Sequence, residues 1–302
     1  MSTILRAARE EGGPRAAWRR RLRALAAMVL VGTLGAAALG TWAWLRPAES
    51  AVAISTWLLQ AGDARGAEWW LARYTRVQGR SLASLALAGQ LLVGRKHPEA
   101  AARYLEEVLR LDPDHPARVS LGLAYELMGR DQDAEAEYRE AVRRRPSDPM
   151  ALNGLGYFLA QRAVRLEEAV SLLHRALEFV PADGSVLDSL GWALYQSGDI
   201  RAALALLQEA ARQVPSSGEI RYHLGLALAR AGARDRALVE LGKAAMLEPD
   251  LPGARQAVVQ LRAGRLPPVP VPWQGHGAWR AARLRAVPSD GPPRLRQMEG
   301  AQ

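Results

Sequence analysis

The sequence contains no cysteine, only two lysines and only two phenylalanines among its 302 residues. The absence of cysteine excludes disulfides, thiol nucleophiles and thiolate metal sites, and it leaves the redox compartment open. No glycine-rich phosphate loop, nucleophile elbow or paired-carboxylate motif is present, and the histidines show no close metal-ligand spacing. These histidines are His97, His115, His174, His223 and His276. We therefore expect a protein that is not an enzyme and that binds neither a metal nor another cofactor.

The net charge of +9 is confined to the two ends of the chain. Residues 1–45 carry a net charge of +5 and residues 265–302 carry +4, whereas residues 46–264 hold 27 basic and 27 acidic side chains. Apart from Lys96 and Lys243, every basic residue is arginine, which is typical of a GC-rich genome. A neutral central region with charged ends argues against nucleic acid as the partner.

Residues 24–45 contain no charged side chain. As a helix they span about 33 Å, which is enough to cross the hydrocarbon core of a bilayer. Five arginines lie just before this run, Arg15, Arg19, Arg20, Arg21 and Arg23, and a single one, Arg46, lies just after it. This asymmetry predicts one transmembrane helix with residues 1–23 as a basic cytoplasmic tail and the rest of the chain on the opposite side.

Two alternatives remain open for this segment. Ala36, Ala37 and Ala38 form a small-residue pattern that a signal peptidase could cleave after an apolar run. Gly32, Ala36 and Gly40 recur at four-residue spacing, which would let a second helix approach closely and form a homodimer. Because the span is rich in alanine, such spacing also arises by chance.

Glycine, alanine and proline recur through the centre of the chain with a period of 33 to 35 residues. The recurring residues are Gly89, Gly122, Gly156, Gly191 and Gly225; Ala101, Ala134, Ala169, Ala203 and Ala237; and Pro113, Pro146, Pro181, Pro215 and Pro249. A period of this length predicts an array of two-helix repeats. Each repeat buries little by itself, so neighbouring repeats share a continuous core, and the protein works as a shaped surface.

The repeats resemble the tetratricopeptide repeat family. Three units fit its pattern closely, at 115–148, 184–217 and 218–251, with Gly at position 8, Ala at position 20 and Pro at position 32 of each. The resemblance implies an all-α fold, a right-handed α-solenoid of about five to six helix-turn-helix units that follows the transmembrane helix. Five units are expected over 82–251, and the unit at 149–183 has an extra residue in its turn.

The sequence on either side of the five units departs from the pattern. Residues 48–81 keep several apolar positions but lack the Leu-Gly pair and the closing proline, so we expect a degenerate helical pair there. Residues 252–264 are expected to form a capping helix. Residues 265–302 are rich in proline and arginine, and alternating prolines after Leu266 favour an extended conformation. This tail is expected to lie along the array, to bind a partner or lipid, or to stay solvated.

In this family the first helix of each unit lines a concave groove. Carried over by position, the resemblance implies these partner-binding residues: Asn153, Tyr157 and Gln161 in one unit; Asp188, Ser189, Trp192, Tyr195 and Gln196 in the next; and Tyr222, His223 and Arg230 in the last. Aromatic side chains mixed with amides and a carboxylate suit an extended or helical peptide. The alternative for Tyr157, Trp192 and Tyr195 is packing within the core.

The basic residues with which some family members hold the carboxyl terminus of a chaperone are missing. The matching positions hold Asn153, Tyr157, Ser185 and Ser189, so we do not expect that binding mode. Asp188 instead favours a cationic or amide-bearing partner.

Two functions remain open from the sequence. The units are similar to those of bacterial cell-envelope repeat proteins, including assembly factors. This likeness implies a membrane-anchored scaffold or assembly factor, with the array on the periplasmic face of the inner membrane and a protein or peptide in its groove. The alternative is a permanent structural subunit of a membrane complex, docked through the transmembrane helix and both tails.

Overall fold

The computed structural model describes residues 47–267, and every regular element in that range is an α-helix. The helices are α3 (Pro47–Gln60), α4 (Ala64–Val77), α5 (Leu82–Val93), α6 (Pro98–Leu111), α7 (Ala117–Leu127), α8 (Asp131–Arg144), α9 (Pro149–Gln161), α10 (Leu166–Phe179), α11 (Gly184–Ser197), α12 (Ile200–Gln213), α13 (Gly218–Arg230), α14 (Arg234–Leu247) and α15 (Ala254–Arg262). The expected all-α class is confirmed.

Several predictions fall outside the described residues. They are the transmembrane segment 24–45, its small residues Gly32, Ala36 and Gly40, and the tail from residue 268 onward. Among the helices from α3 to α15, none combines the length and the apolar character that crossing a bilayer requires.

The chain divides into two compact units, Met1–Gly79 and Arg80–Gln302. In the first unit α3 packs against α4, with Leu71 fully buried between them. Trp57 on α3 and Trp69 on α4 remain 63% and 60% exposed.

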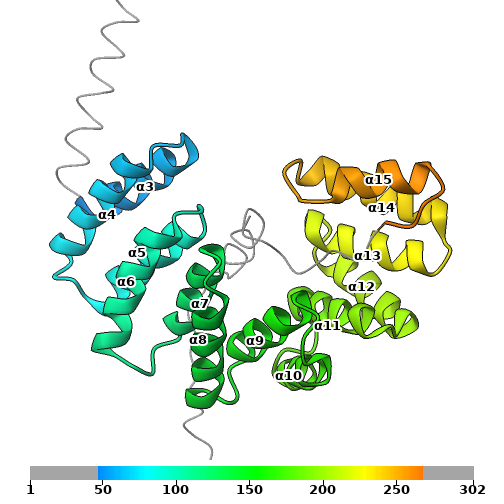
Figure 1. Ribbon diagram of the computed structural model, residues 1–302. Helices are drawn as coiled ribbons and strands as arrows, with labels where there is room; N and C mark the ends of the chain where they lie inside the picture. The colour runs from blue at the N-terminus through cyan, green and yellow to red at the C-terminus, as the bar shows by residue number, and fades with distance from the viewer. Residues whose placement is uncertain (1–46, 268–302) are drawn as a thin grey trace, which may run out of the picture. The chain divides into compact units, whose positions relative to one another are not determined.

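In the second unit, successive helices pack as pairs that stack in chain order (Figure 1). The pairs are α5 with α6, α7 with α8, α9 with α10, α11 with α12, and α13 with α14, followed by α15. The first helices of neighbouring pairs also contact one another, so α9, α11 and α13 lie in one row. This row brings together side chains that are more than 60 residues apart in the sequence.

The recurring glycines lie where the two helices of a pair cross. A Cβ atom at Gly191 would lie 2.7 Å from Cγ of Leu207, and one at Gly225 would lie 2.7 Å from Cγ of Leu241. Both leucines are fully buried, which contributes roughly 1.5–3 kcal/mol each. The repeat therefore places glycine where the fully buried leucine leaves no room for a side chain.

Short polar side chains fix the starts of α9, α11 and α13. Asp183 accepts hydrogen bonds from the backbone N–H groups of Ser185 (2.8 Å) and Val186 (3.0 Å). Asp148 caps α9 and Ser217 caps α13 in the same way. Each cap satisfies backbone donors that the first turn of a helix leaves unpaired, and so sets where the helix begins.

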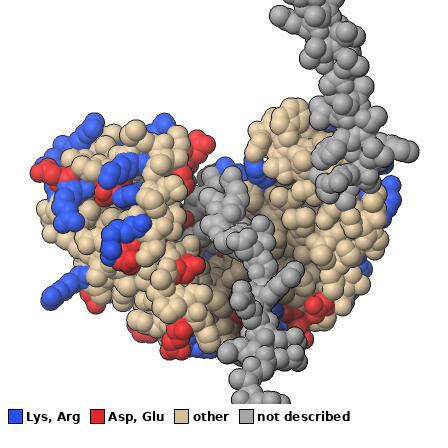
Figure 2. Space-filling view, turned by 180° about the vertical axis from the view of Figure 1, so that it is seen from behind, with Lys and Arg blue, Asp and Glu red and all other residues tan. Residues whose placement is uncertain are grey.

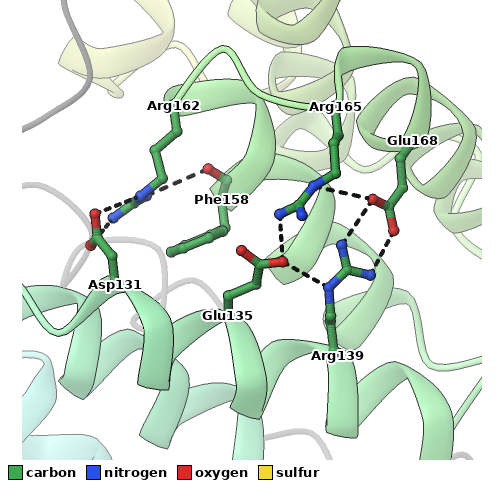
Figure 3. A network of polar contacts seen from close by, with 7 residues as sticks. All are labelled: Asp131, Glu135, Arg139, Phe158, Arg162, Arg165 and Glu168. Atoms are coloured by element: carbon green, nitrogen blue, oxygen red, sulfur yellow. Dashed lines mark hydrogen bonds and ion pairs between the residues drawn. The ribbon is translucent and has the colours of Figure 1, made fainter.

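The extra residue in the unit at 149–183 lies in the turn between α9 and α10, formed by residues 162–165. Ala163 and Arg165 adopt left-handed backbone conformations there, with φ of 50° and 47°. The turn directs Arg162 and Arg165 toward α8 of the preceding pair (Figure 3). The turn that contains the inserted residue thus supplies contacts between two neighbouring repeats.

Arg162 is buried between two carboxylates. Its Nη1 donates to Glu126 Oε1 at 3.0 Å and its Nε donates to Asp131 Oδ2 at 3.0 Å, while the guanidinium lies 3.8 Å from the ring centre of Phe158. Burial by itself lowers the pKa of Arg162. The hydrogen bonds and negative charges of Asp131 and Glu126 have the larger, opposite effect, so the pKa of Arg162 is raised above its ordinary value. Because Glu126 is completely buried and also accepts from Tyr138 at 3.1 Å, this ion pair belongs to the core.

A second, more exposed network lies beside it in Figure 3. Arg139 donates to both carboxylate oxygens of Glu168, at 2.7 and 2.9 Å, and to Glu135 at 2.8 Å. Arg165 bridges the same two glutamates. In the view of Figure 2, basic and acidic side chains lie interspersed over the left part of the visible surface, whereas the right part carries few charged side chains.

Candidate functional site

Side chains from α9, α11 and α13 form one polar and aromatic cluster. On α11, Asp188, Trp192 and Tyr195 are spaced by four and three residues, which places them on one face of the helix. Glu219 and His223 share a face of α13 for the same reason. We call Tyr157, Asp188, Trp192, Tyr195, Glu219, Tyr222 and His223 the inner-face cluster.

Hydrogen bonds join the three helices within this cluster. His223 Nδ1 lies 2.9 Å from Asp188 Oδ1, so α13 is tied to α11. The Tyr157 hydroxyl donates to Glu219, which ties α9 to α13 across 62 residues of sequence, and Gln161 Nε2 donates to the same hydroxyl at 2.7 Å. Asp188 is completely buried, and Glu219 is 4% exposed. Burying carboxylates is costly unless they are paired and hydrogen-bonded, so these contacts are required for the cluster to form.

Aromatic rings pack around the hydrogen-bonded groups. The Trp192 ring stacks on His223, with 4.2 Å between ring centres, and on Tyr195, with 5.0 Å between ring centres. Trp192 is 3% exposed, and its Nε1 has no acceptor among the described residues. A buried indole N–H usually finds an acceptor, so this donor is a position at which a ligand could bind.

The surroundings of the two neighbouring tyrosines raise the pKa of each hydroxyl. Burial raises the pKa of Tyr222 to about 12. Burial also raises the pKa of Tyr195, although Arg230, whose guanidinium lies 6.0 Å from its ring centre, acts in the opposite direction. Both hydroxyls therefore stay protonated to a higher pH than an ordinary tyrosine, and each can donate a hydrogen bond.

The eleven residues expected in the groove differ in their exposure. Seven are buried, three are half-buried and one is exposed. The buried ones are Tyr157, Asp188, Ser189, Trp192, Tyr195, Tyr222 and His223; the half-buried ones are Asn153, Gln161 and Gln196; and Arg230 is exposed. The Ser189 hydroxyl donates to the Ser185 carbonyl of its own helix at 2.9 Å. The structure brings most of these residues together, and their role in partner binding stays a prediction.

Glu219 is the member of the cluster that the sequence analysis did not select. It occupies position 2 of its unit, one of the positions that face inward in tetratricopeptide repeats. This position is the sequence signal that could have identified Glu219 as a groove residue. Ligand-type atoms of Asp188, Glu219 and His223 lie within 4.8 Å of one another. Because the hydrogen bonds from His223 and Tyr157 account for this closeness, the three residues do not by themselves define a metal site.

Comparisons with known proteins agree with this repeat geometry. The family model described as "Tetratricopeptide repeat" matches residues 86–149, 128–184 and 189–254, which together exceed half of the chain. The chain belongs to the tetratricopeptide repeat family. The solenoid fold class is thereby confirmed, and tetratricopeptide repeats in general act as scaffolds for protein–protein interaction.

The individual relatives are similar over limited regions. A "TPR repeat-containing protein PA4667" from Pseudomonas aeruginosa is 42% identical over 69 residues, which cover 23% of this chain and only 12% of that relative. The solved structure of TTC0263, a thermophilic protein of the same family from Thermus thermophilus, covers 61% of this chain and all of its own, at 22% identity and a TM-score of 0.53. A tetratricopeptide repeat protein from Parabacteroides merdae covers 74% of this chain and 90% of its own, at 14% identity and a TM-score of 0.59. These two structures support the fold alone.

Proposed function

We propose that the protein is a membrane-anchored tetratricopeptide repeat scaffold or assembly factor that binds an extended segment of a partner protein at the inner-face cluster. One observation carries the proposal. The row formed by α9, α11 and α13, from three successive repeats, holds a cluster of buried polar groups and aromatic rings. Core positions of a repeat protein need only apolar side chains, whereas this row carries Asp188, Glu219 and His223.

The chemistry of the cluster indicates which partner would fit. Two carboxylates favour a cationic or amide-bearing group, and stacked rings supply a rigid apolar surface with few rotatable bonds. The Trp192 N–H offers a hydrogen bond to a backbone carbonyl. An extended peptide that presents a cationic side chain satisfies all three requirements.

We further propose that residues 24–45 anchor the chain in the bacterial inner membrane and that the array lies on the periplasmic side. The uncharged run and the arginines before it support this arrangement. Trp57 and Trp69 support it as well, because exposed indole rings on the helices that follow the run favour the interface between lipid and water.

Affinity capture after crosslinking in native membranes tests the scaffold function. Trp192→Ala and Tyr222→Ala are expected to reduce recovery of the partner by at least tenfold, because each removes a buried ring from the cluster. Met246→Ala is a matched control, since Met246 is 82% exposed on α14. Circular dichroism of each variant establishes that the array remains folded.

The same capture separates the scaffold from a permanent structural subunit. If both aromatic variants recover the partner normally while substitution of Gly32 and Gly40 abolishes recovery, the contact lies in the membrane and the inner-face proposal is wrong. A reporter fused after Gln302 tests the orientation. It is expected to be active only outside the cytoplasm, and cytoplasmic activity would contradict the topology.

A further inference from the structure

The inner-face cluster has the features of a site for an arginine side chain. Asp188 and Glu219 are buried carboxylates within 4.8 Å of His223, and a guanidinium forms strong, directional hydrogen bonds with carboxylates. Trp192 stacks on Tyr195 and on His223 beside them, so these rings form a rigid aromatic wall of the site. The buried Trp192 Nε1, which has no acceptor among residues 47–267, is available to a peptide carbonyl.

We propose that the occupant of this site is the carboxyl-terminal segment of the chain itself, residues 268–302, with one of its arginines between the carboxylates. This segment contains five arginines against Asp290 and Glu299. Arg280, Arg283 and Arg285 lie close to Trp279 in sequence, so cationic and aromatic groups come together as the site requires. The charge of the segment complements that of the cluster.

The connection is long enough. The described chain ends at Pro267, shortly after α15, which packs against α13 and α14. Gly253, which precedes α15, lies beside Tyr222 of the cluster, since a Cβ there would be 2.7 Å from the tyrosine hydroxyl. From Pro267 to Arg280 there are 13 residues, which span roughly 40 Å at 3.1 Å each in the extended form that alternating prolines favour.

Tethering makes even a weak contact effective. A segment attached this close to its site has an effective concentration on the order of 1 mM, so a site with a dissociation constant of about 0.1 mM would be roughly nine-tenths occupied. A partner that binds the same cluster must displace the segment first. This competition rests on the proposed function, whereas occupancy of the cluster by the segment does not.

The absence of cysteine permits a direct test in the full chain. Spin labels are attached to Ser197→Cys, at the exposed end of α11, and to Ala281→Cys, and the distance between them is measured by pulsed electron paramagnetic resonance in detergent micelles. Dilution with unlabelled protein restricts the signal to pairs within one chain. We expect a narrow distance peak that is lost on replacing Arg280, Arg283 and Arg285 with glutamine, a change that leaves the array untouched.

A second pair of variants tests the cluster side. Asp188→Asn combined with Glu219→Gln is expected to remove the peak, whereas Glu167→Gln combined with Asp235→Asn, two exposed carboxylates at the starts of α10 and α14, is expected to keep it. A broad distribution in the unmodified chain, or a peak that survives the arginine replacements, would overturn the proposal. Neither result affects the partner-capture experiment, so the two proposals fail separately.

Discussion

At the scale of the residue, two glycines allow the contribution of packing to stability to be distinguished from that of helix propensity. Gly191 lies against Leu207, whereas Gly242, within α14, has open space where its Cβ would be. We expect Gly191→Ala to lower the free energy of unfolding by about 1–2 kcal/mol, because the strain of overpacking exceeds the gain in helix propensity.

Gly242→Ala is the matched control for this substitution. It is expected to raise the free energy of unfolding by about 0.5–1 kcal/mol, since only the propensity changes. Urea denaturation measures both variants. If both substitutions changed the free energy of unfolding equally, α11 and α12 would have to move apart enough to accommodate the added methyl group at position 191.

Tyr222 gives a prediction about pH. Its pKa is about 12 in the folded protein against an ordinary value of 10.0, so the folded state holds this proton more tightly than the unfolded chain does. Its contribution to stability is therefore complete below pH 10 and is lost as the pH rises from 10 through 12. The near-ultraviolet absorbance titration of the native protein minus that of Tyr222→Phe should show a single step near pH 12. A step near pH 10 would show that the side chain is solvated.

At the scale of the element, the turn between α9 and α10 connects two repeats. Replacing Arg162 with methionine removes the guanidinium from the buried Glu126 and is expected to cost about 3 kcal/mol. Arg165→Met serves as the control, because Arg165 is half exposed and its ion pairs contribute about 1 kcal/mol or less. Thermal unfolding of both variants is the measurement. A similar loss in both would mean that the burial of Arg162 has no special role.

The helices and their pairing could be predicted from the sequence, because the spacing of Gly191, Ala203 and Pro215 repeats a steric requirement of each pair. The contacts of Arg162 could not be predicted, since an inserted residue shows only where a turn is longer. The burial of Trp192 was likewise open, because it depends on His223 from the next repeat. Position 2 of the unit could have identified Glu219, but its contact with Tyr157, two repeats away, could not be predicted.

At the scale of the whole molecule, different parts of the chain have different tasks. The stacked pairs provide a stable row of helices, the inner-face cluster provides the proposed recognition, and the segments outside 47–267 provide the proposed anchor and the proposed competitor. A repeat array suits this division, because each pair contacts only its neighbours and a site can draw on three pairs without a closed core.

Site-specific photocrosslinking in native membranes tests the central claim most directly. A photoreactive amino acid is placed at Gln196, half-buried on α11 beside the cluster, and separately at the exposed Met246 on α14. The account predicts a discrete adduct with another polypeptide from position 196, lost with Trp192→Ala, and none from position 246. Adducts of equal yield from both positions, or an adduct at 196 that persists with Trp192→Ala, would contradict recognition by the inner face.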